Sequence, residues 1–222
     1  IRWCISCNEC ISRMETALGL TCLVNPEVGR EREMELEHAA KAKRVLVAGG
    51  GPAGLEAARV AALRGHKVTL YEKEQELGGQ FRLASIPPYK HEVTLFLGYL
   101  LRQVEKAGVE VVLGESVSAA LVEEMRPDAV IVATGGRPRI PNISGIDAQH
   151  VVTAHDVLAG KAAVGQKVLI AGGGMVGCET ADFLAEYGRD ITIVEMLPEL
   201  ARDVPAGPRA VSYTHLTLPT KA

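Results

Sequence analysis

The sequence predicts an α/β fold in which two similar strand–turn–helix–strand units each contribute to a parallel sheet. The first observation is an internal repeat: residues 45–72 align without gaps on residues 168–195, at an offset of 123, with 13 of 28 positions identical. Second, each copy starts with a run of branched apolar residues, as in strands buried on both faces of a sheet. Third, a glycine-rich turn joins that run to an alanine-rich segment of about 12 residues, which is long enough for a helix.

The elements after each turn follow from the same patterns. Each alanine-rich segment ends near a glycine, Gly65 or Gly188, and glycine suits a helix C-terminus. The β-branched runs 68–71 and 191–194 predict the second strand of each unit.

Further elements are predicted between the two units. A helix is expected over residues 91–107, after two prolines, and strands are expected over 109–113 and 128–133. Residues 137–147 contain two prolines and a glycine, which predicts a linker.

The domain organisation follows from these elements. The chain starts without methionine, and its last residues do not continue the preceding pattern and resemble a translated sequencing adapter, so we expect an incomplete chain with a non-native tail. The segment that carries most of the cysteines is expected to run on through a charged loop and a short helix over 31–43. The predicted segments are a cysteine segment with its linker (1–43), the N-terminal part of a first nucleotide-binding domain (44–147), the N-terminal part of a second (148–210) and the tail (211–222).

The composition narrows the classes of function. Hydrophobic residues make up 47% of the chain, enough for an ordinary core. The net charge is -3 and no cluster of Lys and Arg forms a basic patch, which argues against a nucleic-acid or membrane partner. The longest apolar runs, 45–55 and 168–178, are shorter than the roughly 18 residues of a membrane span. With no signal peptide visible, we expect a cytoplasmic protein whose oligomeric state the sequence does not indicate.

The glycine-rich turns carry the first functional motif. Each has the pattern G-x-G-x-x-G between a strand and a helix, and an acid follows 18 residues after the last glycine, which is the full context of a Rossmann-like dinucleotide-binding site. The first glycine allows the sharp turn, the second lets the backbone approach a pyrophosphate, and the third lets the helix pack on the strand. The N–H groups at the helix N-terminus attract the phosphates. The predicted binding residues are Gly49, Gly51, Pro52, Ala53, Gly54, Glu72 and Lys73 in the first copy, and Gly172, Gly174, Met175, Val176, Gly177 and Glu195 in the second.

The acids at the ends of the repeats bear on cofactor choice. Glu72 and Glu195 can accept hydrogen bonds from the adenosine ribose hydroxyls. A carboxylate at position 195 repels the 2′-phosphate of NADP, and Met196 and Leu197 follow it where an NADP site would place an arginine. We therefore expect NADH rather than NADPH at the second turn.

Two further motifs resemble elements of flavoprotein reductases with paired nucleotide domains: LGGQ at 77–80 and VIVATGGRP at 130–138. In that group the first turn holds FAD and the second holds NAD(P)H. The resemblance implies that the "ATGG" segment closes over the flavin and that the LGGQ segment lies near its ribityl chain. It adds as cofactor-binding residues Gly79, Gln80, Val117, Ala133, Thr134 and Gly135.

Four of the five cysteines lie in the first 22 residues with the spacing C-x2-C-x2-C-x11-C: Cys4, Cys7, Cys10 and Cys22. Disulfides are disfavoured because the first three are packed so tightly in the sequence. Zinc remains open, although zinc sites commonly use two separated C-x2-C pairs. Three close thiolates and a distant fourth suit a [4Fe–4S] cluster better, and a one-electron carrier has a role beside a flavin domain that zinc does not have. The fifth cysteine, Cys178, is expected to be a small buried hydrophobe.

The cysteine motif running into CLVNP, followed by KRVLVAGGGPAGLEAARVAALRGHKVTLYEK, resembles the 2,4-dienoyl-CoA reductase and enoate reductase branch of the old yellow enzyme family, to which trimethylamine dehydrogenase is related. The resemblance covers residues 1–210. It implies a preceding (β/α)8 barrel with FMN that is missing here, and a relay from NADH through FAD and a [4Fe–4S] cluster to that FMN, which reduces an activated C=C bond. The catalytic residues for that reduction would lie in the barrel, so none is assigned here.

Two alternatives remain from the sequence. One is an amine dehydrogenase like the trimethylamine enzyme, with a vestigial second nucleotide site and electrons leaving to a partner. The other is a zinc-stapled nucleotide-binding module without redox activity.

Overall fold

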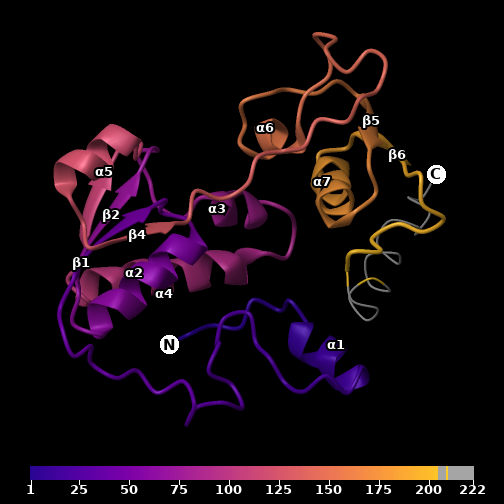
Figure 1. Cartoon of the computed structure of the whole chain (residues 1–222). Helices are drawn as coiled ribbons and strands as arrows, with labels where there is room; N and C mark the ends of the chain where they lie inside the picture. Colours follow the sequence, from indigo (N-terminus) through magenta and orange to yellow (C-terminus); the bar gives the residue numbers. More distant parts are fainter. Residues whose placement is uncertain (205–208, 210–222) are drawn as a thin grey trace. The chain divides into compact units, whose positions relative to one another are not determined.

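The structure is a computed structural model that describes residues 1–204 and 209 (Figure 1), so the predicted non-native tail, 211–222, lies outside the described residues. The chain divides into two compact units: unit 1 comprises residues 1–5, 29–85 and 92–137, and unit 2 comprises residues 6–28, 86–91 and the described part of 138–222. The domain boundaries expected from the sequence stay a prediction. The elements in chain order are α1 (Glu9–Glu15), β1 (Arg44–Ala48), α2 (Pro52–Leu63), β2 (Lys67–Glu72), α3 (Gln80–Ala84), α4 (His91–Lys106), β3 (Glu110–Leu113), α5 (Ala119–Met125), β4 (Ala129–Val132), α6 (Ala154–Leu158), β5 (Lys167–Ala171), α7 (Met175–Glu186) and β6 (Asp190–Val194).

Unit 1 is built on a four-stranded sheet in the order β3-β2-β1-β4. All three strand pairs are parallel, and β1 aligns Val45 with Val68 on one side and with Ala129 on the other. The continuous apolar runs therefore form central strands: Leu46 is 1% exposed and Leu70 is fully buried. Both strands end at the same edge of the sheet, where the first glycine turn begins.

Helices cover the sheet of unit 1. The glycine-turn helix α2 buries Leu55 and Ala58 completely. The longest helix, α4, buries one stripe at helical spacing: Val93, Phe96, Leu97, Leu100 and Val104. On α5, Leu121 and Val122 pack against a buried cluster that includes Leu46 and Tyr71. This packing holds the carboxyl ends of β1 and β2 in place, and these ends carry the predicted site.

Unit 2 repeats the first three elements of unit 1 in β5, α7 and β6. Strands β5 and β6 pair in parallel, with Val168 beside Ile191, and form a two-stranded sheet in the described part of the chain. Leu169 is 67% exposed, whereas Leu46 at the equivalent position is 1% exposed. The pattern is the same in both copies, but the flanking strands of unit 1 give its apolar side chains the deeper burial.

The short helix predicted over residues 31–43 is wrong. Residues 31–43 form turns and bends, with no helix. Their backbone instead bonds to the end of α2: the Ala39 N–H donates to the Arg64 carbonyl at 2.9 Å, and the Lys43 N–H donates to His66 Nδ1 at 3.2 Å. These tertiary hydrogen bonds satisfy groups that a helix would have paired internally.

The predicted helix over 91–107 and the predicted strands near 109–113 and 128–133 are confirmed as α4, β3 and β4. Residues 137–147, predicted to be a linker, contain no helix or strand. The sequence patterns do not predict four helices of five to seven residues, α1, α3, α5 and α6, because so few residues carry no clear period. None of the helices in the described part of the chain is long and apolar enough to cross a membrane.

Candidate functional site

The first glycine turn joins β1 to α2 in a shape that requires glycine at its first and last positions. Gly49 has φ 111°, and a Cβ placed on it would collide with the carbonyl oxygen of Ala133. A Cβ on Gly54 would overlap the carbonyl oxygen of Gly49. Gly51 differs, because a Cβ there would meet no atom within 4 Å. The first and third glycines are therefore required by packing, and the second leaves open space in front of the backbone, as a bound pyrophosphate would need.

The second turn has the same geometry. Gly172 has φ 110°, and a Cβ on Gly177 would overlap the carbonyl oxygen of Gly172. Helix α7 begins at the surface with Met175 and Val176, which are 44% and 49% exposed. The repeat seen in the sequence is therefore also a repeat in three dimensions.

The glutamate at the end of each sequence repeat accepts a hydrogen bond from the backbone of its own glycine turn. Glu72 is 7% exposed, and its Oε2 accepts a hydrogen bond from the Gly50 N–H at 2.6 Å. Glu195 Oε2 accepts the equivalent bond from the Gly173 N–H at 2.7 Å, and its Oε1 accepts one from the Leu197 N–H at 2.9 Å. The backbone N–H groups of Leu197 and Gly173 lower the pKa of Glu195, so its carboxylate is charged at neutral pH.

These contacts sharpen the sequence prediction. An ionised carboxylate has about four lone-pair sites, so each acid can hold its turn and still accept a ribose hydroxyl. Only the second of these roles is predicted from the sequence.

Other predicted residues of unit 1 come together around the first turn. Ala133 continues from β4, and its N–H donates to the Ala48 carbonyl at 2.8 Å. Gln80 Nε2 donates to the Gly136 carbonyl at 2.8 Å, which links the LGGQ segment to the loop of Thr134 and Gly135. A Cβ on Gly79 would lie 3.0 Å from Gly51 Cα, so the two segments approach closely.

Two predicted residues lie less directly at the turn. Val117 packs against the buried cluster of Leu46, Ala48 and Tyr71. Lys73 is an exposed side chain whose Nζ lies 3.5 Å from Glu74. Cofactor contacts at both positions stay a prediction.

In the described part of the chain, the four cysteines of the N-terminal segment are not gathered into a ligand site as the residues around the first turn are gathered. None of the five cysteines forms a disulfide. Ser6 and Asn8, on either side of Cys7, have left-handed φ values of 54° and 55°, and α1 begins directly afterwards with Cys10 inside it. Within the described ranges, 1–204 and 209, no three Cys, His, Asp or Glu side chains converge as ligands of one metal ion. The four thiols fit an iron–sulfur cluster or zinc by their chemistry, and their assembly stays a prediction.

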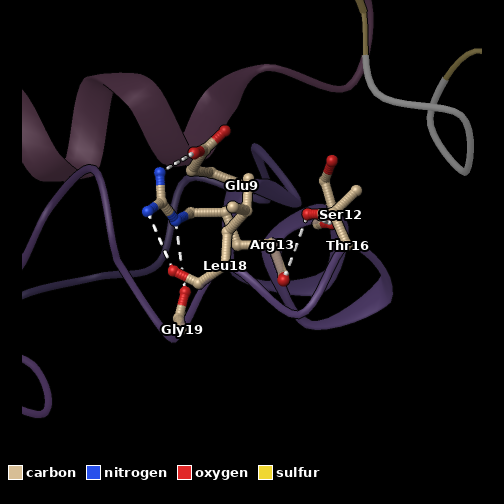
Figure 2. A network of polar contacts seen from close by, with 6 residues as sticks. All are labelled: Glu9, Ser12, Arg13, Thr16, Leu18 and Gly19. Atoms are coloured by element: carbon tan, nitrogen blue, oxygen red, sulfur yellow. Dashed lines mark hydrogen bonds and ion pairs between the residues drawn. The ribbon is translucent and has the colours of Figure 1, made fainter.

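The helix that carries Cys10 is tied to the chain leading to Cys22. Figure 2 shows the guanidinium of Arg13 donating to two backbone carbonyls, those of Leu18 and Gly19, each at 3.1 Å. The Nη1 atom of Arg13 also lies 3.8 Å from Oε1 of Glu9, one turn earlier in α1. This fixes the return of the chain after α1, and nothing in the cysteine spacing indicated it.

Cys178 is 3% exposed on α7, which confirms the expected buried hydrophobe. Its Sγ donates to the Gly173 carbonyl at 3.3 Å. Burial raises the pKa of this thiol, with a smaller contribution from the carboxylate of Asp203. The thiol is therefore neutral and supports the second turn by packing.

The family model for pyridine nucleotide-disulphide oxidoreductases matches residues 43–216, which include both turns. The chain belongs to this family. Membership confirms the α/β fold class with Rossmann-like nucleotide-binding units.

Comparison with individual proteins shows which members of the family the chain resembles. The chain is 48% identical over 211 residues to an NADH oxidase of Thermoanaerobacter brockii, covering 92% of this chain and 32% of the relative. It is 45% identical over 197 residues to a cinnamate reductase of Clostridium sporogenes, covering 88% of this chain and 29% of the relative. A solved structure of 2-naphthoyl-CoA reductase superposes with a TM-score of 0.91 at 34% identity, covering 96% of this chain and 33% of that one. The resemblance to the 2,4-dienoyl-CoA and enoate reductase branch is confirmed, and the chain spans about a third of the length of these relatives.

Three features were not predicted from the sequence. They are the contacts of Arg13, the covering of the two turns by Leu77 and Leu200, and the hydrogen bond from the first N–H of α7 to Asp203. A signal for the leucines was present, because Leu77 and Leu200 keep the offset of 123 beyond the aligned repeat.

Proposed function

We propose that this chain is the electron-input arm of an NADH-dependent flavin and iron–sulfur oxidoreductase. The first turn holds FAD, the second takes up NADH, and Cys4, Cys7, Cys10 and Cys22 bind a [4Fe–4S] cluster. A barrel with FMN, elsewhere in the same polypeptide, receives the electrons and reduces an activated C=C bond, such as that of a 2-enoate or a 2,4-dienoyl-CoA. The observation that supports this proposal most is that two glycine turns of the same backbone shape follow a segment with four cysteines in the sequence.

The residues of the chain have separate tasks in this proposal. When bound, the cofactors supply hydride and single-electron transfer, since a flavin exchanges both and a cluster carries one electron at a time. Gly51 keeps the backbone open toward a pyrophosphate at the N-terminus of α2. Glu72 holds the turn in this shape and can also accept a ribose hydroxyl. The loop of Ala133 to Gly135 and the side chain of Gln80 close the site from the other side.

The second turn favours electron input over an amine dehydrogenase. In the dehydrogenase alternative this turn would be vestigial and would not need to take up NADH. Here Gly172 and Gly177 keep the tight approach of the first turn, and Glu195 keeps the same hydrogen bond to the backbone as Glu72.

The deciding experiment uses the full-length protein that contains this sequence, purified without oxygen. We expect about four iron and four sulfide per polypeptide, both FAD and FMN, and bleaching of the flavin absorbance by NADH. Stoichiometric zinc with iron near zero would instead support the zinc-stapled module. Intact cluster and flavins that NADH fails to bleach would support the amine dehydrogenase.

Glu195 provides a test of nucleotide choice. We expect Glu195→Gln to raise kcat/KM for NADPH relative to NADH about tenfold or more, because it removes the charge that repels a 2′-phosphate and keeps an oxygen to hold the turn. Stopped-flow bleaching of the flavin by each nucleotide measures this ratio. Glu199→Gln is the matched control, since Glu199 is an exposed acid on the same segment. An unchanged ratio in Glu195→Gln would remove this residue from nucleotide selection.

A further inference from the structure

The repeat continues in space beyond the aligned residues. Residues 77–80 and 200–203, at the same offset of 123, each cross a glycine turn, and we name them the first and second strap. The side chain of Leu77 would touch a Cβ on Gly50, as that of Leu200 would on Gly173. The second residue of each turn also has an equivalent hydrogen bond: the Gly50 carbonyl accepts from the N–H of residue 78 at 2.8 Å, and the Gly173 carbonyl accepts from that of residue 201 at 2.6 Å.

The two straps differ at their last residue. The first ends in Gln80, an uncharged side chain that donates to the Gly136 carbonyl. The second ends in Asp203, whose Oδ1 and Oδ2 accept from the Met175 N–H at 2.9 and 3.1 Å. Helix α2 has Pro52 at the position equivalent to Met175, and proline has no N–H to donate.

Asp203 thereby places a negative charge where the second turn would meet a diphosphate. A Cβ on Gly174, the glycine expected to approach the pyrophosphate, would lie 3.1 Å from Asp203 Oδ2. The N-terminus of a helix carries about half a positive charge, and a carboxylate bonded to its first N–H neutralises part of that charge. Asp203 also raises the pKa of Cys178 in the first turn of α7, which agrees with this position.

We propose that Asp203 weakens the hold of the second turn on the diphosphate of the nicotinamide nucleotide, so that this nucleotide exchanges readily. The first turn, with the neutral Gln80 in its strap, retains its own dinucleotide. This inference rests on the proposed function, because it requires the second turn to bind NADH. Asp203 acts on affinity through the charge at α7 and does not touch the reacting atoms.

The test compares Asp203→Asn with wild type in the full-length holoenzyme. Asparagine keeps an oxygen that can accept from the Met175 N–H and removes the charge. We expect the Kd of NADH and of ADP to fall about tenfold, each measured by anaerobic titration calorimetry on dithionite-reduced enzyme, so that NADH binds without reducing the flavin. The Kd of adenosine, which has no phosphate, should stay unchanged, as should FAD content and thermal unfolding. The control is Asp147→Asn, which removes the same charge from an exposed loop position.

The possible results separate the inference from the proposed function. Unchanged or weaker NADH binding by Asp203→Asn, beside a wild type that binds NADH, overturns the inference alone. Equal tightening for adenosine also overturns it, because the effect would not act on the phosphates. A wild type that binds no NADH overturns the proposed function and the inference together. If Asp203→Asn is unstable, Asp203→Ser provides the same comparison with a neutral oxygen on the strap.

Discussion

Gly54→Ala is expected to destroy the first nucleotide site by unfolding unit 1 locally. The added Cβ would overlap the carbonyl oxygen of Gly49, which is backbone and cannot rotate away. Either α2 moves off the sheet or the turn opens. Overpacking of this kind lowers the free energy of unfolding by about 3 kcal/mol. We expect the thermal midpoint to fall by roughly 10 °C and FAD to be absent from the purified full-length protein.

Gly51→Ala is the matched control for this prediction. Its Cβ would enter open space, so we expect thermal unfolding close to that of wild type. FAD binding should still weaken at least about tenfold, because the methyl group stands where the pyrophosphate approaches the backbone. Flavin absorbance of the purified protein and differential scanning calorimetry measure the two effects. The packing argument is wrong if Gly54→Ala keeps FAD and its midpoint, and the pyrophosphate argument is wrong if Gly51→Ala keeps wild-type affinity for FAD.

Serine at Cys7 or Cys10 is expected to interrupt electron transfer without disturbing the nucleotide turns. Loss of one thiolate removes a ligand from the proposed cluster, so iron and sulfide should fall well below those of wild type. NADH should still bleach the FAD, whose proposed site lies in unit 1, while reduction of a 2-enoate falls about a thousandfold or more. Anaerobic metal analysis and stopped-flow absorbance follow the two steps separately.

Cys178→Ala is the control among the cysteines. Its thiol is 3% exposed and bonded to the Gly173 carbonyl, away from the N-terminal segment in the sequence, so we expect iron and sulfide at wild-type levels. Wild-type iron content in both Cys7→Ser and Cys10→Ser would contradict the assignment of these thiols as ligands. Loss of zinc in place of iron would favour the zinc-stapled module.

Much of the fold could be predicted because its signals are local. A strand buried on both faces needs a continuous apolar run, and the helix after it needs a glycine turn, so residues 45–72 and 168–195 predict β1, α2, β2 and their copies. The clash that requires Gly54 also lies within six residues of chain, because the added Cβ would meet the Gly49 carbonyl oxygen. Residues 31–43 show the limit: their helical composition yields to hydrogen bonds with Arg64 and His66, which are distant in the sequence.

The sequence by itself determined the two nucleotide turns, their acids and the four thiols, because each depends on residues at a fixed short spacing. Only the tertiary structure decided how those turns are covered. Gln80 reaches the Gly136 carbonyl across 56 positions of chain, and Asp203 reaches the Met175 N–H across 28. Such contacts join a side chain to a backbone group that has no identity in the sequence, since every residue except proline offers the same N–H. The negative charge at the second turn therefore follows from the path of the second strap over α7, which the spacing of residues does not predict.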